Sequence, residues 1–140
     1  MIKVIALDLE GTLISNAVSQ FPRPGLLDFL NKCKSMCSRV VIFTTVREEV
    51  FRAVAKLLVS ESCAPDWFET IEYINWHGKT KNLSFIPDVA VDEALLVDDM
   101  HLYVHPGQEA SWVEISKFEH PYPETDTELS SILNEIQKRM

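Results

Sequence analysis

The sequence predicts a single α/β domain with three layers: a mainly parallel sheet of five strands with helices on both of its faces. Short apolar runs alternate with amphipathic helical patterns along the chain, and such runs are typical of parallel strands buried on both faces. The 140 residues are enough for one domain, 1–140, and the 46% hydrophobic content excludes a disordered chain. We therefore expect one compact core.

The first part of the chain has the pattern strand, helix, strand, helix. Val4–Leu7 is a β-rich apolar run and predicts the first strand. Pro24 comes just before apolar residues that recur at helical spacing, and proline is tolerated in the first turn of a helix. These residues are Leu26, Phe29, Leu30, Cys33 and Cys37. Arg39–Phe43 predicts a second strand, and Thr45 with Glu48 matches a capping box that would begin the next helix.

The second part adds three strands and a last helix. Apolar runs predict strands at Ile71–Ile74, Ala94–Val97 and Trp112–Ile115. Thr125 and Glu128 match a second capping box in front of an apolar helical face. The alternation of these elements favours a parallel sheet with right-handed crossovers.

Charge and cysteine content restrict the partners and the compartment. The net charge of −8 repels nucleic-acid backbones and anionic membranes, which argues against both as partners. Cys33, Cys37 and Cys63 form no even-numbered disulfide framework, so we expect buried free thiols in a reducing compartment. Asp8 ends the first apolar run too early for a secretory signal, and the sequence holds no apolar stretch of 18 residues. We therefore expect a soluble, cytoplasmic protein.

Polar residues follow the predicted strands at the edge where parallel sheets bind ligands. In chain order they are Asp8, Glu10, Thr44, Thr45, Lys79, Lys81, Asp98 and Asp99. Carboxylates gathered in one place repel one another unless a cation is present. Ligand sets made of oxygen alone suit Mg²⁺. A carboxylate beside Mg²⁺, a lysine and a threonine hydroxyl is the equipment for phosphoryl transfer through an aspartyl-phosphate. Thr44 and Thr45 also fit a helix-capping role, and Lys79 and Lys81 compete for a single role.

These motifs resemble those of the haloacid dehalogenase (HAD) superfamily, whose phosphatases have a Rossmann-like fold. The segment Asp8-Leu9-Glu10-Gly11-Thr12-Leu13 is similar to its first motif, Val41-Ile42-Phe43-Thr44 to its second and Leu95-Leu96-Val97-Asp98-Asp99 to its fourth. The closest resemblance is to the capless NIF-like group, which includes the small C-terminal-domain phosphatases. Arg23-Pro24 before Leu27-Asp28-Phe29-Leu30, and Lys81-Asn82-Leu83-Ser84, resemble two stretches of that group.

The resemblance implies a role for each matched residue. Asp8 would be the nucleophile and a Mg²⁺ ligand, and Glu10 would be the general acid and base, with its backbone carbonyl on the metal. Thr44 would bind the phosphoryl group, and Lys81 would neutralise it together with the nucleophile. Asp98 and Asp99 would complete the metal site, with Asp99 as the preferred direct ligand.

The chain departs from the group in two places. Glu10 stands where the family usually has the shorter Asp, and Met100-His101-Leu102 replaces a Ser-Pro pair after the acidic residues. The first departure leaves open a silent HAD-fold binding module. A phospho-receiver signalling domain is a third hypothesis, but its acidic pair precedes the phosphorylated Asp, the reverse of the order found in this chain.

The distances between motifs leave no room for a cap domain. Asp8 and Thr44 are 36 residues apart, and Thr44 and Lys81 are 37 apart, which the helices of the sheet fill. The short interval from Asp8 to Arg23 allows only a small flap. The leading hypothesis is a Mg²⁺-dependent phosphomonoester hydrolase with an open site. Such a site favours a phosphoprotein or another large phosphorylated substrate, such as a nucleic-acid end, over a small phosphometabolite. The negative net charge argues against the nucleic acid.

Overall fold

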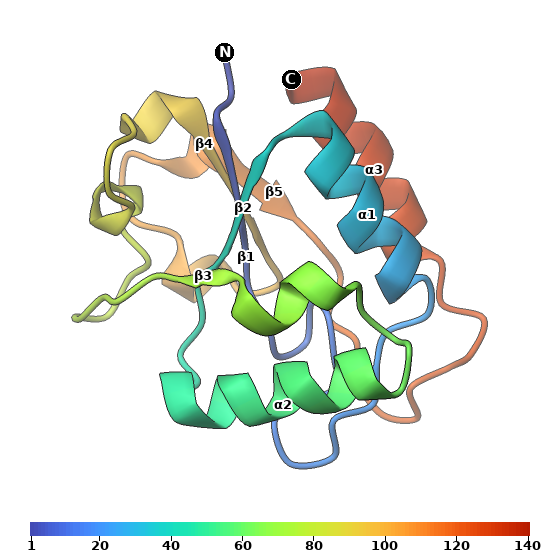
Figure 1. Ribbon diagram of the computed structural model, residues 1–140. Helices are drawn as coiled ribbons and strands as arrows, with labels where there is room; N and C mark the ends of the chain where they lie inside the picture. The colour runs from blue at the N-terminus through green and yellow to red at the C-terminus, as the bar shows by residue number, and fades with distance from the viewer.

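The computed structural model describes all 140 residues and has one sheet of five parallel strands (Figure 1). The strands are β1 (Val4–Leu7), β2 (Arg39–Ile42), β3 (Glu72–Tyr73), β4 (Ala94–Asp98) and β5 (Trp112–Glu114). The α-helices are α1 (Leu26–Met36), α2 (Glu48–Ser60) and α3 (Glu128–Arg139). The predicted α/β class and five-stranded sheet are confirmed, and no cap domain is present. No helix has both the length and the apolar character needed to cross a membrane.

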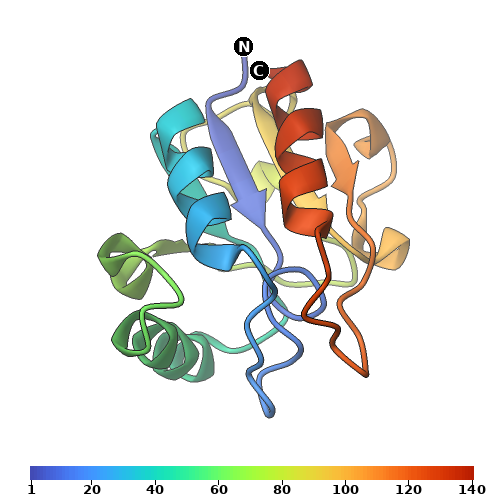
Figure 2. The same cartoon turned by 90° about the vertical axis from the view of Figure 1, so that its right-hand side faces the viewer.

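The two faces of the sheet are covered in different ways. Alternate strand residues such as Leu7, Ile42 and Val97 belong to a cluster of 26 buried residues that includes the apolar faces of α1, α2 and α3. The opposite face forms a smaller cluster of 9 buried residues. Leu83, in a short 3-10 helix, and Ile86, directly after it, belong to this cluster. Figure 2 shows α1 and α3 side by side in front of the sheet. The helices predicted on both faces are therefore α-helices on one face, and only short 3-10 helices and turns on the other.

The strand order places the end of β1 at the topological switch point of the sheet. The order is β3-β2-β1-β4-β5, so the chain moves outward from β1 to β3 and then returns to the other side of β1. Leu7 of β1 is in register with Val97 of β4, so the residues that follow these two strands emerge next to each other. Ligands of open α/β sheets bind at such switch points.

Both predicted capping boxes are wrong. The helices α2 and α3 begin after Arg47 and Thr127, and neither of these two residues makes a capping hydrogen bond with its side chain. Thr45 is exposed, and the Glu128 carboxylate accepts a hydrogen bond from the Ser116 backbone N–H at 3.2 Å. The Glu128 N–H donates instead to Asp126 Oδ1 at 3.1 Å. Asp126, instead of the predicted Thr125, therefore supplies the side-chain acceptor at the start of α3.

The cysteines are free thiols, as predicted. Cys33 and Cys37 are buried and Cys63 is half-buried. Burial, and then the neighbouring Cys37, raise the pKa of the Cys33 thiol to about 12.

Arg23 connects the loop after β1 to the start of α3. Its Nε and Nη2 donate to the two carboxylate oxygens of Asp126 at 3.0 and 3.1 Å. Its Nη1 donates to the backbone carbonyls of Gly11 and Thr12, both at 3.2 Å. The side chain is 1% exposed and lies over the Phe118 ring. Arg23 therefore satisfies four acceptors of two separate loops.

We expect Arg23→Met to lower the free energy of unfolding by about 3 kcal/mol, because it takes a charged hydrogen-bond donor from the half-buried Asp126 carboxylate and from the carbonyls of Gly11 and Thr12. Urea denaturation measures the change. Arg52→Met, which removes a more exposed ion pair with Glu48, is the control and should change it by less than about 1 kcal/mol. Equal effects of the two substitutions would contradict a structural role for Arg23.

Candidate active site

The polar residues predicted from the sequence meet at the carboxyl ends of the three central strands. Asp8 follows β1, Thr44 follows β2 by two residues, and Asp98 ends β4. A cavity of about 320 Å³ opens at this edge and is lined in part by Asp8, Glu10 and Asp99. The order of the strands therefore brings residues from three distant parts of the chain to one place.

Lys81 is the cation of the site. Its Nζ donates to Asp8 Oδ1 at 2.8 Å and to Asp98 Oδ2 at 2.5 Å, and the side chain is fully buried. The ammonium also lies 5.0 Å from the centre of the Tyr103 ring. Burial opposes the charge, but the carboxylates of Asp8 and Asp98 outweigh it, so the pKa of Lys81 is raised. Lys79, the alternative in the sequence, is exposed.

A hydrogen-bonded clamp holds the segment that carries Lys81. The Lys81 N–H donates to the Tyr103 carbonyl at 2.7 Å. Asn82 Oδ1 accepts from Gln108 Nε2 at 2.8 Å, and its amide nitrogen lies 3.2 Å from His105 Nε2. Thr80 Oγ1 contacts the other ring nitrogen of His105 at 2.7 Å. Residues 80–82 are therefore fastened to residues 103–108.

Three carboxylates lie close together beside Lys81. Oxygens of Asp8, Asp98 and Asp99 all lie within 4.8 Å of one another. Burial, followed by a hydrogen bond and repulsion from Asp8, raises the pKa of Asp99 to about 7. Burial and the negative charge of Asp8 also raise the pKa of Asp98. Three carboxylates paired with the one ammonium of Lys81 carry excess negative charge. Their oxygens therefore fit a hard divalent cation such as Mg²⁺.

Thr12 and Gly11 shape the loop that carries these carboxylates. The Thr12 hydroxyl donates to Asp8 Oδ2 at 2.8 Å and lies 3.4 Å from Asp99 Oδ1. Gly11 has a positive φ of 77°, and a Cβ at this position would lie 2.5 Å from Asp99 Oδ2. A side chain at position 11 would therefore displace Asp99 as well as strain the backbone.

Glu10 stands apart from the three aspartates. Its Oε2 accepts a hydrogen bond from the Ala17 N–H at 2.7 Å, and its side chain lines the cavity. Ala17 lies in a small flap, residues 14–22, whose ends are joined by an antiparallel bridge between Ile14 and Pro22. One carboxylate oxygen is thus bound to the flap, and no protein donor occupies the other. The Glu10 side chain is not part of the carboxylate cluster.

Thr44 is buried and holds its hydroxyl in a defined place. Its Oγ1 accepts a hydrogen bond from the Val46 N–H at 3.1 Å, which leaves the hydroxyl hydrogen free to donate. Its carbonyl accepts from Trp76 Nε1 at 2.8 Å. Thr45 is exposed and lines the cavity.

Sequence reasoning gave no role to several residues that complete the site. Thr12 and Arg23 lie within the two stretches, Asp8–Leu13 and Arg23-Pro24, that resemble family motifs. This resemblance is the one signal by which a role for them could have been predicted. Tyr103, His105 and Lys117 carry no local pattern; Tyr103 and Lys117 line the cavity, and His105 belongs to the clamp. Their positions depend on contacts between segments far apart in the sequence.

An uncapped parallel sheet with an aspartate after its first strand, a buried lysine beside it and an acidic pair after the fourth strand defines the HAD class of phosphatases. The family model of the NLI interacting factor-like phosphatases matches residues 3–140, so the chain belongs to this family. It is a HAD-type phosphatase and acts on a phosphorylated substrate. A comparison with curated proteins finds no match. The family match favours the enzyme over the silent binding module and the receiver domain.

We expect Lys81→Met to lower turnover by about 10²–10³-fold, because it removes the buried ammonium that neutralises Asp8 and Asp98 and leaves their negative charge to repel an anionic substrate. Without the ammonium, the pKa of Asp98 is raised further above its unfolded value. The folded state then binds more protons than the unfolded state, so stability should rise as the pH falls from about 8 to 5. Phosphate release and thermal midpoints measure both effects. Lys56→Met, at an exposed position of α2, should match the wild type.

Proposed function

We propose that this phosphatase is a Mg²⁺-dependent phosphomonoester hydrolase that works through an aspartyl-phosphate on Asp8. The observation that carries the proposal is the fixed Asp8 carboxylate. Lys81 holds one of its oxygens and Thr12 the other, and two further carboxylates lie beside it. A carboxylate held in one orientation at the edge of an open cavity is suited to attack a phosphorus atom.

In the first step, an oxygen of Asp8 forms a bond to phosphorus while the bond from phosphorus to the leaving-group oxygen breaks. Glu10 in its acid form gives its proton to that leaving oxygen. The free hydroxyl hydrogen of Thr44 and the ammonium of Lys81 support the charge on the phosphoryl oxygens.

In the second step, water attacks the phosphorus of the aspartyl-phosphate. The Glu10 carboxylate accepts a proton from this water, the bond between Asp8 and phosphorus breaks, and inorganic phosphate leaves. Asp8 and the acid form of Glu10 are then restored. The hydrogen bond from Ala17 to Glu10 supports this dual role, because it fixes the carboxylate at the cavity wall while one oxygen stays free.

Asp8, Asp98 and Asp99 would hold Mg²⁺, with the Glu10 carbonyl as a further ligand. The bound ion would supply positive charge against the phosphoryl oxygens. Asp98 is already occupied, because its oxygens accept hydrogen bonds from Lys81 and from the Met100 N–H at 2.9 Å. Asp99 forms no ion pair with a lysine or arginine, which supports its assignment as a direct ligand.

The open site supports a large substrate. No cap domain covers the cavity, which is bordered by the flap of residues 14–22 and by the loop of residues 117–122. We therefore infer that the substrate is a phosphoprotein or another large phosphorylated molecule. A panel of phosphopeptides and phosphometabolites, with Mg²⁺ and with EDTA, tests the proposed function. Turnover that persists in excess EDTA would contradict the metal requirement.

We expect Asp8→Asn to remove all turnover, because an amide cannot form the phospho-enzyme. Glu10→Gln should instead slow an alkyl phosphate by about 10²–10⁴-fold and a nitrophenyl phosphate much less, since the latter needs no proton on its leaving group. Single-turnover rates on both substrates measure the difference. The Gln side chain keeps an acceptor for the Ala17 N–H, so its effect reports on proton transfer. A fully active Asp8→Asn protein would contradict the covalent mechanism.

We expect the affinity for Mg²⁺ to rise with pH up to about 7 and then to level off, because Asp99 must lose its proton to bind the metal and its pKa is raised to about 7. Calorimetric titrations in two buffers of different ionisation enthalpy would measure both the affinity and the released proton. Asp99→Asn should weaken binding and abolish this pH dependence, and Asp98→Asn should weaken binding less. Asp92→Asn, at an exposed position, is the control.

A further inference from the structure

A second and larger hollow adjoins the active-site cavity. This groove has a volume of about 620 Å³ and is lined by residues that follow β2 and β3, together with Tyr103. Thr45 and Tyr103 line both the groove and the cavity that contains Asp8. Thr44, whose hydroxyl we propose donates to the phosphoryl group, also lines the groove. A substrate whose phosphate lies against Asp8 can therefore extend into the groove.

The charge of the groove is opposite to that of the protein as a whole. The chain has a net charge of −8, yet no Asp or Glu lines the groove, whereas Arg47, His77 and Lys79 do. Lys79 forms no ion pair. Arg47 pairs only with Glu49 at 3.2 Å, where both side chains are more than two-thirds exposed at 76% and 69%. An exposed pair of this kind is weak and leaves Arg47 available to another anion.

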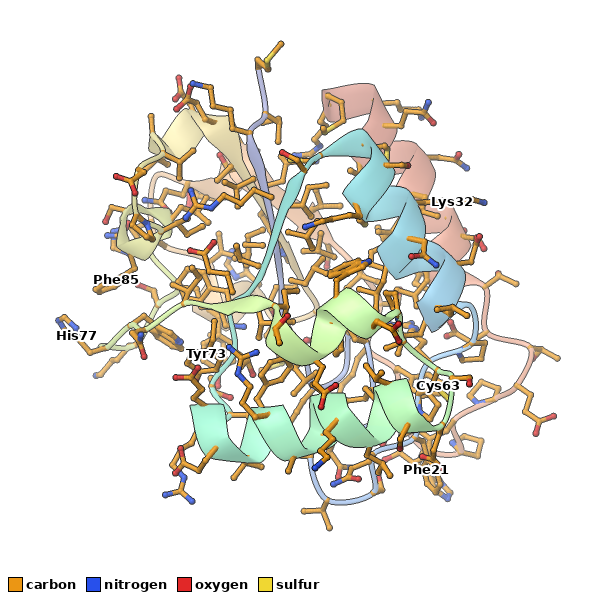
Figure 3. All side chains as sticks on the ribbon, in the orientation of Figure 1. Phe21, Lys32, Cys63, Tyr73, His77 and Phe85 are labelled. Atoms are coloured by element: carbon orange, nitrogen blue, oxygen red, sulfur yellow. The ribbon has the colours of Figure 1, made fainter.

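Two aromatic residues make the wall of the groove rigid and connect it to the site. Trp76 Nε1 donates to the Thr44 carbonyl, and the Tyr73 hydroxyl donates to the Val46 carbonyl. Figure 3 shows Tyr73 and His77 along the segment that leaves β3, with His77 at its outer end. The hydrogen-bonding groups of Trp76 and Tyr73 are thus used within the protein. Arg47 and Lys79 remain as the cations that the groove offers to a ligand.

We propose that the groove binds a second anionic group of the substrate, a carboxylate or a phosphate, on the leaving-group side of the scissile phosphate. This inference rests on the proposed function, because it takes Asp8 as the place of the reacting phosphate. Lys79 and Arg47 are the residues that select the anion. Acidic side chains near a phosphorylated residue would supply it in a protein, and a second phosphate would supply it in a small molecule.

The test uses matched substrates and matched variants of the full chain. One pair is a neutral phosphoserine peptide and the same peptide with Asp on both sides of the phosphoserine; the other is a hexose monophosphate and a hexose bisphosphate. The variants are Lys79→Gln, Arg47→Gln and the double substitution. Lys56→Gln, on the exposed side of α2, removes one positive charge away from the groove and is the control.

We expect the wild type and the control to prefer the anionic member of at least one pair in kcat/KM, mainly through KM. Each single variant should reduce the preference by roughly fivefold and the double variant by roughly twentyfold. High salt should reduce it as well, since the charges are exposed. Preference within the peptide pair would assign the anion to a protein, and preference within the hexose pair to a small molecule.

Equal kcat/KM values within both pairs, or a preference that the double variant keeps, would overturn the inference while Mg²⁺-dependent hydrolysis still upheld the proposed function. If the wild type hydrolysed no phosphomonoester, the proposed function would fail instead. The same peptides would then be titrated by calorimetry against Asp8→Asn. Tighter binding of the acidic peptide, lost on substitution of Lys79, would still support the anionic groove, and equal binding of both peptides would reject it.

Discussion

The rest of the site depends on one buried ammonium. The register of β1 with β4 forces Asp8 and Asp98 to emerge side by side, so the fold itself creates a concentration of negative charge. Lys81 is fully buried between the two carboxylates, and its ammonium offsets their mutual repulsion. Two charges inside a protein are stable only when their hydrogen bonds are well formed. The clamp around Asn82 and His105 therefore serves the site, because it fixes the segment from which the ammonium projects.

Arg23 repeats this principle at a second place. Arg23 is also a buried cation, and it connects two segments outside the helices and strands, one at Gly11 and one at Asp126. Together the two cations fix the loops on both sides of the cavity, while the apolar clusters fix the sheet beneath them. Apolar packing sets the architecture, and charge-assisted hydrogen bonds set the positions of the reactive groups. The exposed cations of the groove, Lys79 and Arg47, have no such structural duty.

The regular elements could be predicted because their signals are local. Runs such as Val4–Leu7 and Ala94–Val97 have the apolar composition of buried parallel strands, and the structure contains both strands. The residues gathered at the sheet edge follow from the strands that precede them. The second capping box was wrong because the Glu128 carboxylate accepts a hydrogen bond from Ser116, a tertiary contact that no local pattern reveals. In the first, the Glu48 carboxylate accepts from Arg52 one turn later in the same helix. The contacts of His105 are equally invisible in the sequence, since they join segments more than 20 residues apart.

The free thiols have a consequence for how the molecule withstands oxidation. Peroxide attacks the thiolate form of cysteine, and a thiol with a pKa of about 12, as at Cys33, holds almost no thiolate at neutral pH. No cysteine lines the cavity that contains Asp8. Phosphatases with a thiolate nucleophile lose activity when that sulfur is oxidised. A site built from carboxylates, a hydroxyl and an ammonium has no such thiolate, so oxidation of the cysteines leaves these groups unchanged.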